Sequence, residues 1–333
     1  MQSEAVQSLL TVAGGYIVSR CTHVVAELGV ADALDGSPRS AAELADAVGA
    51  SPTALYRVMR LLSAHGIFSV QNESFAHTPA SRLLRTDHPQ SMRAFVRMMG
   101  LPPVWSAYGH LMHSVRTGQP AADEIAPGGI RFYAEDPAAA AIFNAAMTAK
   151  AYQHIAGILN VYDFRRFGVI GDIGGGRGHL LRAILDSVPT ARGVLFELPT
   201  VIEEARRLGA DRLTFQSGDF FKDALPVCDL YLLMEVVHDW EDSEALAILG
   251  SVRRAAPPHA TLLLLEQMVA DGPEPDWAKT IDIHMLAVNG GRQRALPEYT
   301  AMLDQTGFVL ERDIDTGAGI AILEARLSRP GRT

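Results

Sequence analysis

A mostly helical N-terminal region followed by an α/β domain with a largely parallel sheet is the fold that the sequence predicts. Two observations support it. From residue 168 onward, short apolar strands alternate with helical segments, which is typical of a parallel sheet with helices on both faces. Before residue 95, apolar residues recur at helical spacing until two short strands appear. The chain has 333 residues, of which 48% are hydrophobic, so it is long enough for two domains with buried cores.

The first 95 residues follow the order of a winged helix. Residues 5–34 are apolar at helical spacing. Ser40-Ala41-Ala42-Glu43 has the spacing of a capping box, and Ser51-Pro52 offers a cap and a proline at the first position of the next helix. Two short strands, 67–70 and 75–78, then flank a polar turn. Helix, turn, helix and β-hairpin in this order predict a winged-helix domain.

Winged helices often bind DNA, but the charges of this one do not favour that function. Residues 1–90 contain six Arg and eight Asp or Glu, and six minus eight gives a net charge of about −2. The whole chain carries a formal net charge of −9, whereas a nucleic-acid-binding face needs positive charge. The helices over residues 6–34 are also more apolar than one exposed layer needs. We therefore predict a dimerisation domain and a homodimer, and DNA binding by a transcriptional regulator is the least favoured alternative.

The second domain is predicted from the change in periodicity. Its five strands are expected at 169–173, 193–197, 213–216, 229–234 and 261–266, with helices at 179–187, 201–208 and 243–256. Residues 91–165 are expected to be helical, with breaks at 100–103 and 126–129. The predicted domains are residues 1–95, a helical linker at 96–165 that contributes to the substrate pocket, and residues 166–330.

A glycine-rich turn follows the first of these strands. Asp172 and Ile173 lead into Gly174, Gly175, Gly176 and Gly178, and a helix begins directly after them. Glycine lets a backbone approach a ligand closely, and the start of a helix offers unpaired N–H groups. Sites for NAD, FAD and S-adenosylmethionine all use such a turn, so the turn alone indicates only a nucleotide-like ligand.

Acidic residues at successive strand ends narrow the choice of ligand. Asp172 suits the ammonium group of a methionine moiety, whereas in a dinucleotide site it would face a pyrophosphate. Glu197 ends the next strand and can accept hydrogen bonds from both ribose hydroxyls. Asp219 can accept one from an adenine amino group, while Phe220 covers the ring. These residues predict S-adenosylmethionine as the cofactor; their neighbours Leu198 and Gly218 belong to the predicted binding set.

The segment after the fourth strand contains His238-Asp239-Trp240. With the glycine turn, Glu197 and residues 218–220 in the same order, the chain resembles the small-molecule O-methyltransferases of the caffeic-acid and hydroxyindole type, including bacterial natural-product tailoring enzymes. The resemblance covers most of the chain, the winged-helix region included, and its most specific element is His-Asp-Trp. It implies a Rossmann-like S-adenosylmethionine-binding domain, a homodimer, an aromatic or polyketide-like acceptor, and a role in secondary metabolism; no metal is expected.

His238 is the predicted general base. A phenol hydroxyl becomes a good nucleophile toward a sulfonium methyl group only when its proton leaves, and histidine is the usual base near neutral pH. By resemblance, Glu266 orients this histidine. Gln293 stands where the family usually has a second acid; a glutamine can still orient an imidazole but stabilises its cation less.

The resemblance also implies residues for the adenine and the acceptor. Trp240 matches the residue that packs near the adenine, and Met234 stands where many members carry a lysine near the cofactor. Aromatic, thioether and amide side chains are suited to holding a flat acceptor. The predicted substrate-binding residues are Phe143, Asn144, Met147, Asp282, Met285 and Asn289.

Other functions stay open at this point. The same scaffold hosts N-methyltransferases, whose neutral amine acceptors need no base, and enzymes that use the bound cofactor for decarboxylation, hydroxylation or cyclisation. Cys21 and Cys228 lack metal-type spacing, which favours a reducing compartment. The start of the chain lacks the pattern of a signal peptide, and the apolar runs are short. We therefore expect a cytoplasmic protein that binds neither membranes nor nucleic acids.

Overall fold

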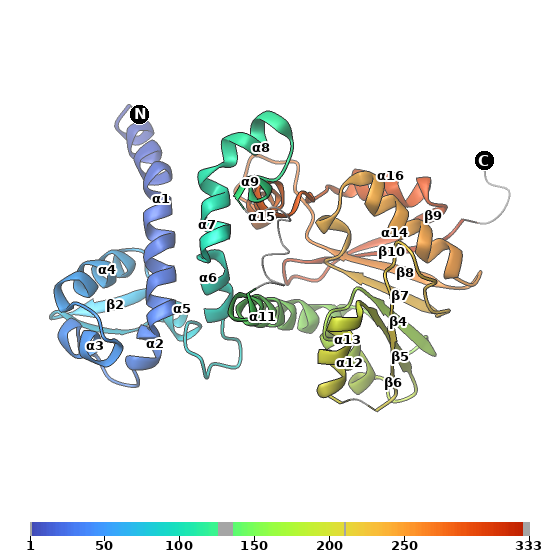
Figure 1. Cartoon of the computed structure of the whole chain (residues 1–333), viewed down its shortest axis with the longest axis horizontal. Helices are drawn as coiled ribbons and strands as arrows, with labels where there is room; N and C mark the ends of the chain where they lie inside the picture. The colour runs from blue at the N-terminus through green and yellow to red at the C-terminus, as the bar shows by residue number, and fades with distance from the viewer. Residues whose placement is uncertain (1, 126–135, 210, 329–333) are drawn as a thin grey trace. The chain divides into compact units, whose positions relative to one another are not determined.

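The structure is a computed structural model that describes residues 2–125, 136–209 and 211–328 (Figure 1). The chain forms two compact units. The first combines Met1–Trp105 with Arg131–Lys150, and the second combines Ser106–Ile130 with Ala151–Thr333. Each unit is described by itself below. The predicted break at 126–129 lies outside the described residues, and the predicted domain boundaries stay predictions.

The first unit contains helices, of which α1 has 27 residues, and a three-stranded sheet. Its elements are α1 (Gln2–Leu28), α2 (Val30–Ala33), β1 (Arg39–Ser40), α3 (Ala41–Val48), α4 (Pro52–Ala64), β2 (Phe68–Gln71), β3 (Ser74–His77), α5 (Pro79–Arg82), α6 (Arg93–Met99), the first half of α7 (Pro102–Gly109) and the part of α11 (Pro137–Val161) up to Lys150. The helical stretch expected over residues 5–34 forms two helices in the structure. Gly29 adopts φ 71, which ends α1 and starts α2.

The local signals in this unit explain where its elements begin and turn. Ser40 and Glu43 form the predicted capping box, with the Ser40 N–H donating to the Glu43 carboxylate at 2.8 Å. Ser51 precedes α4, but its side chain makes no capping hydrogen bond. Asn72 and Glu73 have φ 48 and φ 62, as expected for the tight turn of a hairpin. Strands β1, β3 and β2 lie side by side in this order, which completes the predicted wing.

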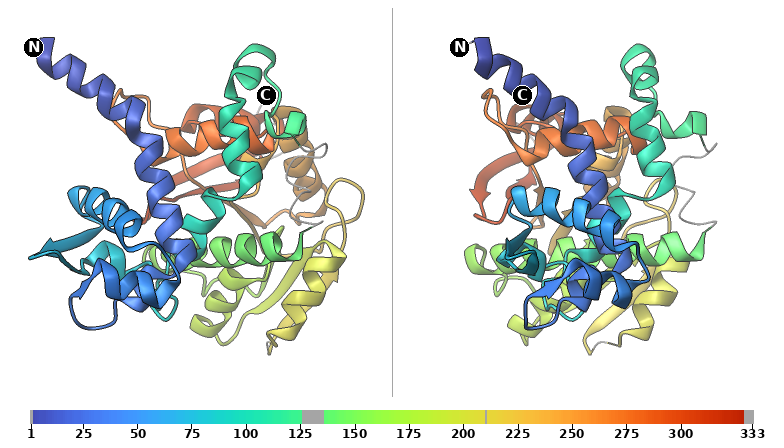
Figure 2. Two further views of the ribbon diagram at one scale, coloured as in Figure 1. Left: turned by 60° about the vertical axis from the view of Figure 1, so that its left-hand side comes forward. Right: turned by 90° about the vertical axis from the view of Figure 1, so that its left-hand side faces the viewer.

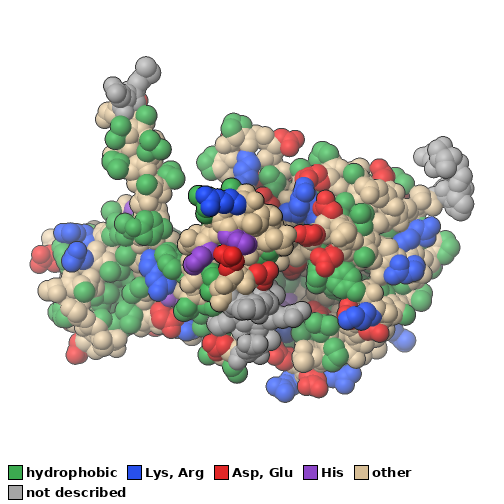
Figure 3. Space-filling model, turned by 45° about the horizontal axis from the view of Figure 1, so that its top comes forward, with side chains coloured by type: hydrophobic (Ala, Val, Ile, Leu, Met, Phe, Trp, Pro, Cys, Tyr) green, Lys and Arg blue, Asp and Glu red, His purple; other side chains and the backbone are tan. Residues whose placement is uncertain are grey.

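The outer surface of α1 is apolar. Leu9, Val12 and Tyr16 are 72%, 80% and 64% exposed, and apolar side chains cover this helix in Figure 3. Residues Ser3–Leu28 are long and apolar enough to pass as a membrane span by length and composition alone. A helix that is buried in a subunit interface has the same apolar composition.

The second unit is built on a seven-stranded sheet. Its strands are β4 (Val169–Ile173), β5 (Arg192–Glu197), β6 (Leu213–Ser217), β7 (Leu230–Met234), β8 (Thr261–Glu266), β9 (Phe308–Asp315) and β10 (Ala321–Leu327). The order is β6-β5-β4-β7-β8-β10-β9, and the first five strands run parallel. These are the five predicted strands. The antiparallel pair β9 and β10, which extends the sheet beyond β8, was not predicted.

Helices cover both faces of this sheet, as predicted (Figure 2). Leu230 and Leu232 pack on one face with α11 (Pro137–Val161), α12 (His179–Ser187) and α13 (Pro199–Arg207). Tyr231 and Leu233 pack on the other face with α14 (Asp242–Ala255) and α16 (Leu296–Gln305). Successive side chains of a strand point to opposite faces, so a continuous apolar run fills two cores.

In the second unit, helices that precede the first strand of the sheet pack against helices that lie between β8 and β9 in the chain. The elements are α8 (Leu111–Thr117), α9 (Ala122–Ile125), α15 (Trp277–His284) and η3, a turn of π-helix (Met285–Asn289). Ala107, Ala121, Ala287 and Val288 form their small common core. The remaining element, η2 (Val237–Asp239), is a single 3₁₀ turn that follows β7 and carries His238.

Candidate active site

The glycine turn has the backbone that its sequence demands. Gly174, Gly176 and Gly178 have φ 69, 57 and 75, a region that side chains with a Cβ rarely adopt. Gly175 is needed for a different reason, because a Cβ there would lie 2.2 Å from the Asp172 carboxyl carbon. Gly178 caps the start of α12, so unpaired N–H groups of this helix face the end of the turn.

Asp172 is buried with little to compensate its charge, since only a weak interaction with the Leu181 backbone favours the ionised form. It is 1% exposed, and neither carboxylate oxygen has a hydrogen bond within the described residues. Burial, and then the charge of Glu197, raise its pKa to about 7. A buried carboxylate in this state gains from a cationic or hydrogen-bond-donating ligand. The ammonium group of S-adenosylmethionine has that chemistry, so the residues present fit the predicted cofactor.

The two other predicted acids differ in their surroundings. Glu197 ends β5, accepts a hydrogen bond from the Leu198 N–H at 2.5 Å, and has its pKa raised by burial. Asp219 is already bound to the Lys222 ammonium at 2.8 Å, which lowers the pKa of the carboxyl, and it accepts from the Phe221 N–H. A carboxylate can accept further hydrogen bonds, so these contacts leave Asp219 able to accept from an adenine amino group.

Aromatic rings gather beside this edge of the sheet. The ring centroids of Phe220 and Trp240 lie 5.7 Å apart, and both rings also pack edge-on against Phe221, each at 4.8 Å. Phe220 and Trp240 were predicted from separate signals, and the structure brings them together. Phe221 was missed, although it follows Phe220 directly. Gly218 contacts Phe196 closely, since a Cβ there would lie 2.6 Å from that ring.

His238 forms a buried pair with Glu266. His238 is 4% exposed, Glu266 is fully buried, and Nδ1 lies 2.7 Å from Glu266 Oε2. The carboxylate can only accept, which assigns the Nδ1 proton to this bond and directs Nε2 away from Glu266. Asp239 Oδ1 lies 3.5 Å from Nε2. Burial lowers the pKa of His238, but the charges of Glu266 and Asp239 outweigh it and raise the pKa to about 9.

Gln293 stands where the family usually has a second acid, but its side chain makes no hydrogen bond to His238 in the structure. The side chain is buried, and neither its amide nitrogen nor its amide oxygen has a hydrogen-bond partner within the described ranges. Its backbone N–H donates to Asp282 Oδ1 at 2.9 Å. Glu266 therefore orients the imidazole through hydrogen bonds, while the predicted catalytic role of Gln293 stays a prediction.

The predicted acceptor residues fall in both units. Asn289 donates to Asp239 Oδ1 at 3.2 Å and contacts the Met285 sulfur at 3.4 Å, so these two lie beside the His238 turn. The third acceptor residue of this unit is Asp282 on α15, which accepts from Gln293 N–H at 2.9 Å. Met234, which was predicted to bind the cofactor, ends β7. The first unit contains the other three, half-buried on α11: Phe143, Asn144 and Met147.

Several polar residues of the second unit were missed from the sequence. Tyr108 Oη lies 2.6 Å from His284 Nδ1. Glu235, with φ 54, accepts from Gln267 at 2.6 Å and lies 3.5 Å from His154 Nδ1. Arg294 is fully buried. Positive φ outside glycine and the burial of ionisable side chains depend on tertiary contacts, which the sequence alone does not reveal.

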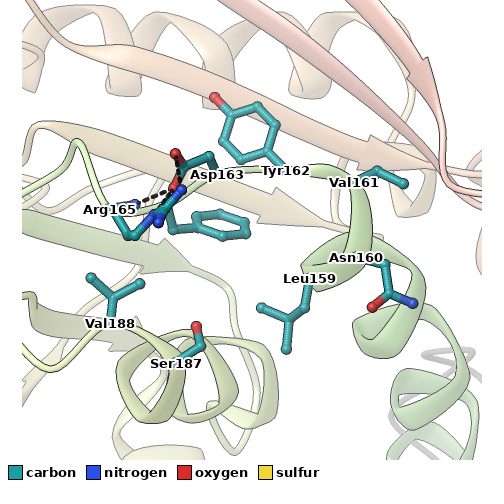
Figure 4. Close-up of a pocket in the computed structure, with 9 residues that line it drawn as sticks. Leu159, Asn160, Val161, Tyr162, Asp163, Arg165, Ser187 and Val188 are labelled. Atoms are coloured by element: carbon teal, nitrogen blue, oxygen red, sulfur yellow. Dashed lines mark hydrogen bonds and ion pairs between the residues drawn. The ribbon is translucent and has the colours of Figure 1, made fainter.

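A separate surface pocket of about 430 Å³ lies where α11 ends, lined by Leu159 to Arg165, Ser187 and Val188 (Figure 4). It contains no predicted site residue. Within the described ranges, no group of three or more His, Cys, Asp or Glu is arranged to hold a metal ion.

Comparisons with known proteins agree with this geometry. Residues 108–309 match the family model of the O-methyltransferase domain, and residues 10–87 match the O-methyltransferase dimerisation domain. A phenazine O-methyltransferase of Lysobacter antibioticus is 37% identical over 96% of this chain and 95% of its own length. An 8-amino-8-demethylriboflavin N,N-dimethyltransferase of Streptomyces davaonensis is 34% identical over 91% and 90%. The structure of the mitomycin 7-O-methyltransferase MmcR superposes with a TM-score of 0.90 at 34% identity, over 98% and 99% of the chains.

The fold and the site thus define an S-adenosylmethionine-dependent methyltransferase with an N-terminal dimerisation domain. The chain belongs to the O-methyltransferase family whose bacterial members tailor natural products.

Proposed function

We propose that this enzyme methylates a hydroxyl group of an aromatic or polyketide-like small molecule in secondary metabolism, with His238 as the general base. The observation that carries the proposal is the buried pair of His238 and Glu266, whose Nδ1 and Oε2 lie 2.7 Å apart at the carboxyl edge of the sheet. Ligands of open α/β sheets bind at this edge. The phenazine and mitomycin relatives, whose names describe O-methylation, support the same chemistry.

The proposed reaction uses the two nitrogens of His238 differently. Nδ1 keeps its proton and donates a hydrogen bond to Glu266, so Nε2 is the nitrogen that accepts the proton of the acceptor hydroxyl. S-adenosylmethionine supplies the methyl group. When the proton arrives, the imidazolium is stabilised by Glu266 on one side and by Asp239, 3.5 Å from Nε2, on the other. The proton therefore moves to a site whose charge the protein already favours.

The cofactor would be held by residues of this chain at three strand ends. Asp172 and the N–H groups after Gly178 suit the methionine end, Glu197 suits the ribose, and Asp219 with Phe220 suits the adenine. Asp172 supports this assignment because its buried carboxylate has no other partner among the described residues.

The test is the His238→Ala variant. Replacing the base should lower kcat by about 10²- to 10⁴-fold. Calorimetric binding of S-adenosylhomocysteine should stay within about twofold of wild type, since His238 is not among the proposed cofactor contacts. His259→Ala is the matched control, because His259 also pairs with a carboxylate, Asp229 at 2.9 Å, at the opposite edge of the sheet. The acceptor for this assay would be found by screening phenols and heteroaromatic compounds for methylated products by mass spectrometry. Wild-type turnover by His238→Ala would overturn the base assignment.

A second candidate is N-methylation, and the riboflavin N,N-dimethyltransferase relative favours it. A neutral amine needs no base before attack, so His238→Ala would then retain most of its turnover. Product mass separates both candidates from non-methylating chemistry, because methyl transfer adds about 14 mass units to the acceptor and leaves S-adenosylhomocysteine.

A further inference from the structure

The element that carries His238 cannot hold its own shape. Turn η2 consists of three residues, Val237 to Asp239, in 3₁₀ geometry. One short 3₁₀ turn has few internal hydrogen bonds and is not stable alone. The position of the imidazole must therefore be set by contacts from elsewhere in the chain. The contacts to the backbone of this turn identify which residues set it.

The segment Gly290–Arg294 supplies most of these contacts. Arg292 N–H donates to the His238 carbonyl at 2.9 Å. Gly291 lies so close to the turn that a Cβ there would be 2.1 Å from the same carbonyl oxygen. On the other side of the turn, Glu266 Oε1 accepts from Val237 N–H at 2.9 Å. The turn is thus held between the end of β8 and this glycine-containing segment.

Arg294 makes further contacts to the backbone of this turn. It is fully buried and donates to the carbonyls of Val237 at 3.1 Å and Trp240 at 2.8 Å, which flank His238. Its Nε and Nη2 also donate to Asp242 Oδ1, at 3.0 and 2.8 Å, where α14 begins. With a weaker bond to the Arg292 carbonyl at 3.4 Å, these bonds use all five of its N–H groups. A planar fork of this kind fixes direction as well as distance.

We propose that Arg294 is a positioning residue for catalysis, holding the carbonyls on both sides of His238 so that Nε2 is aimed at the acceptor hydroxyl. The inference rests on the proposed role of His238 as the base. Arg294 itself touches neither reactant in this scheme. Its effect is on the alignment of the imidazole, so it belongs to the chemical step and not to ligand binding.

The variants Arg294→Met and Arg294→Lys test this role. Methionine fills similar volume without donors, and a misplaced base should lower kcat by about 10²-fold. Lysine keeps the charge and three donors in place of five, so a loss of roughly tenfold is expected. KM and the affinity for S-adenosylhomocysteine should stay within about threefold of wild type. A wild-type kcat in folded Arg294→Met, assayed well below its melting temperature, would overturn the proposal.

Arg212 offers a matched control. It also donates to three backbone carbonyls, those of Leu185, Val188 and Ala191, but at the opposite edge of the sheet. Arg212→Met should lower the melting temperature and leave kcat unchanged below it. If Arg212→Met lowers kcat as much as Arg294→Met does, then both losses reflect general destabilisation and the proposal fails.

A double-mutant cycle separates this inference from the base assignment. If Arg294 acts through His238, adding Arg294→Met to His238→Ala should change kcat by less than about threefold. A further loss as large as in the wild-type background would overturn the positioning role while leaving the base assignment intact. Turnover of His238→Ala at the wild-type rate would instead overturn the base assignment.

A spectroscopic signal tests the same point without an acceptor. The buried Nδ1–H of His238, bonded to Glu266 at 2.7 Å, should give a protected, downfield imidazole N–H resonance that His238→Ala lacks. Arg294→Met should broaden or abolish it, and Arg212→Met should leave it in place. A resonance unchanged by Arg294→Met would show that the turn keeps its position without Arg294.

Discussion

Asp172 and His238 are buried ionisable residues at the two ends of the site, and the protein treats them in opposite ways. Asp172 is 1% exposed and has no hydrogen-bond partner in the described part of the chain. His238 is 4% exposed and has a carboxylate on each side. Burial raises the pKa of Asp172 to about 7, which disfavours its charge, whereas Glu266 and Asp239 overcome burial and raise the pKa of His238 to about 9, which favours its charge.

The contrast indicates what each end still lacks. A carboxylate without a partner gains from a bound cation, so the Asp172 end is complete only with its ligand. The imidazolium at His238 is already compensated by two carboxylates, so that end stabilises the charge that forms when His238 takes a proton from the acceptor. We propose that the charge of Asp172 is compensated only when the cofactor binds, whereas the charge of the His238 imidazolium is compensated by the protein itself.

Removing the carboxylate at the His238 end should have the largest effect. In Glu266→Gln, one amide oxygen replaces the two oxygens that accept from Val237 N–H and His238 Nδ1–H. We expect kcat to fall by about 10²-fold or more, since the imidazole loses both its orientation and its counter-charge. Glu324→Gln is the control: this acid is also buried but is paired with Arg166 and Arg312. Equal losses of kcat in both variants would contradict the assignment.

The pH dependence of activity tests whether Glu266 raises the pKa of His238. Below a pKa of about 9, the neutral base is a minor species, so log(kcat/KM) should rise with pH between about 7 and 9 in the wild type. Glu266→Gln loses the strongest influence that raises this pKa, so the rising part of its pH–activity curve should move to lower pH. A rise at the same pH in both proteins would assign the titration to another group.

At the other end, Asp172→Asn should weaken the binding of S-adenosylmethionine. Losing a charge-assisted bond costs about 1.5–3 kcal/mol, or roughly 10- to 100-fold in Kd. The unliganded variant should nevertheless be more stable at pH 8. Stability from a carboxyl whose folded pKa is raised is fully present below about 3.8 and is lost as the pH rises through about 7. Asp229→Asn, at the opposite edge of the sheet, is the control for affinity. A less stable Asp172→Asn at pH 8 would contradict the account.

The smallest effect is expected at Gln293. Its buried amide has no hydrogen-bond partner in the described ranges, so Gln293→Met should raise the free energy of unfolding by about 1 kcal/mol. Because Glu266 already orients His238, kcat should change by less than about threefold. A loss above tenfold would show that Gln293 orients the imidazole in the reacting complex.

Local signals in the sequence predicted much of this architecture. Strands β4 and β8 were placed to the residue because apolar runs end at glycines or at an acid. Strands β9 and β10 were missed because β9 is an edge strand with charged residues such as Glu311 and Arg312 between its apolar ones. The pairing of His238 with Glu266 was inferred only through the family resemblance. Arg294 gave no signal, since a buried arginine depends on carbonyls that folding alone brings together.

The number of protons released when the cofactor site is filled tests the contrast between Asp172 and His238 most directly. S-adenosylhomocysteine, which also carries an ammonium group, would be titrated calorimetrically at pH 7 in buffers of different ionisation enthalpy. Because the pKa of Asp172 is about 7 without ligand, the account predicts release of about half a proton per site, and none for Asp172→Asn. Proton release that is absent, or the same in both proteins, would contradict the claim that Asp172 is kept for the cofactor.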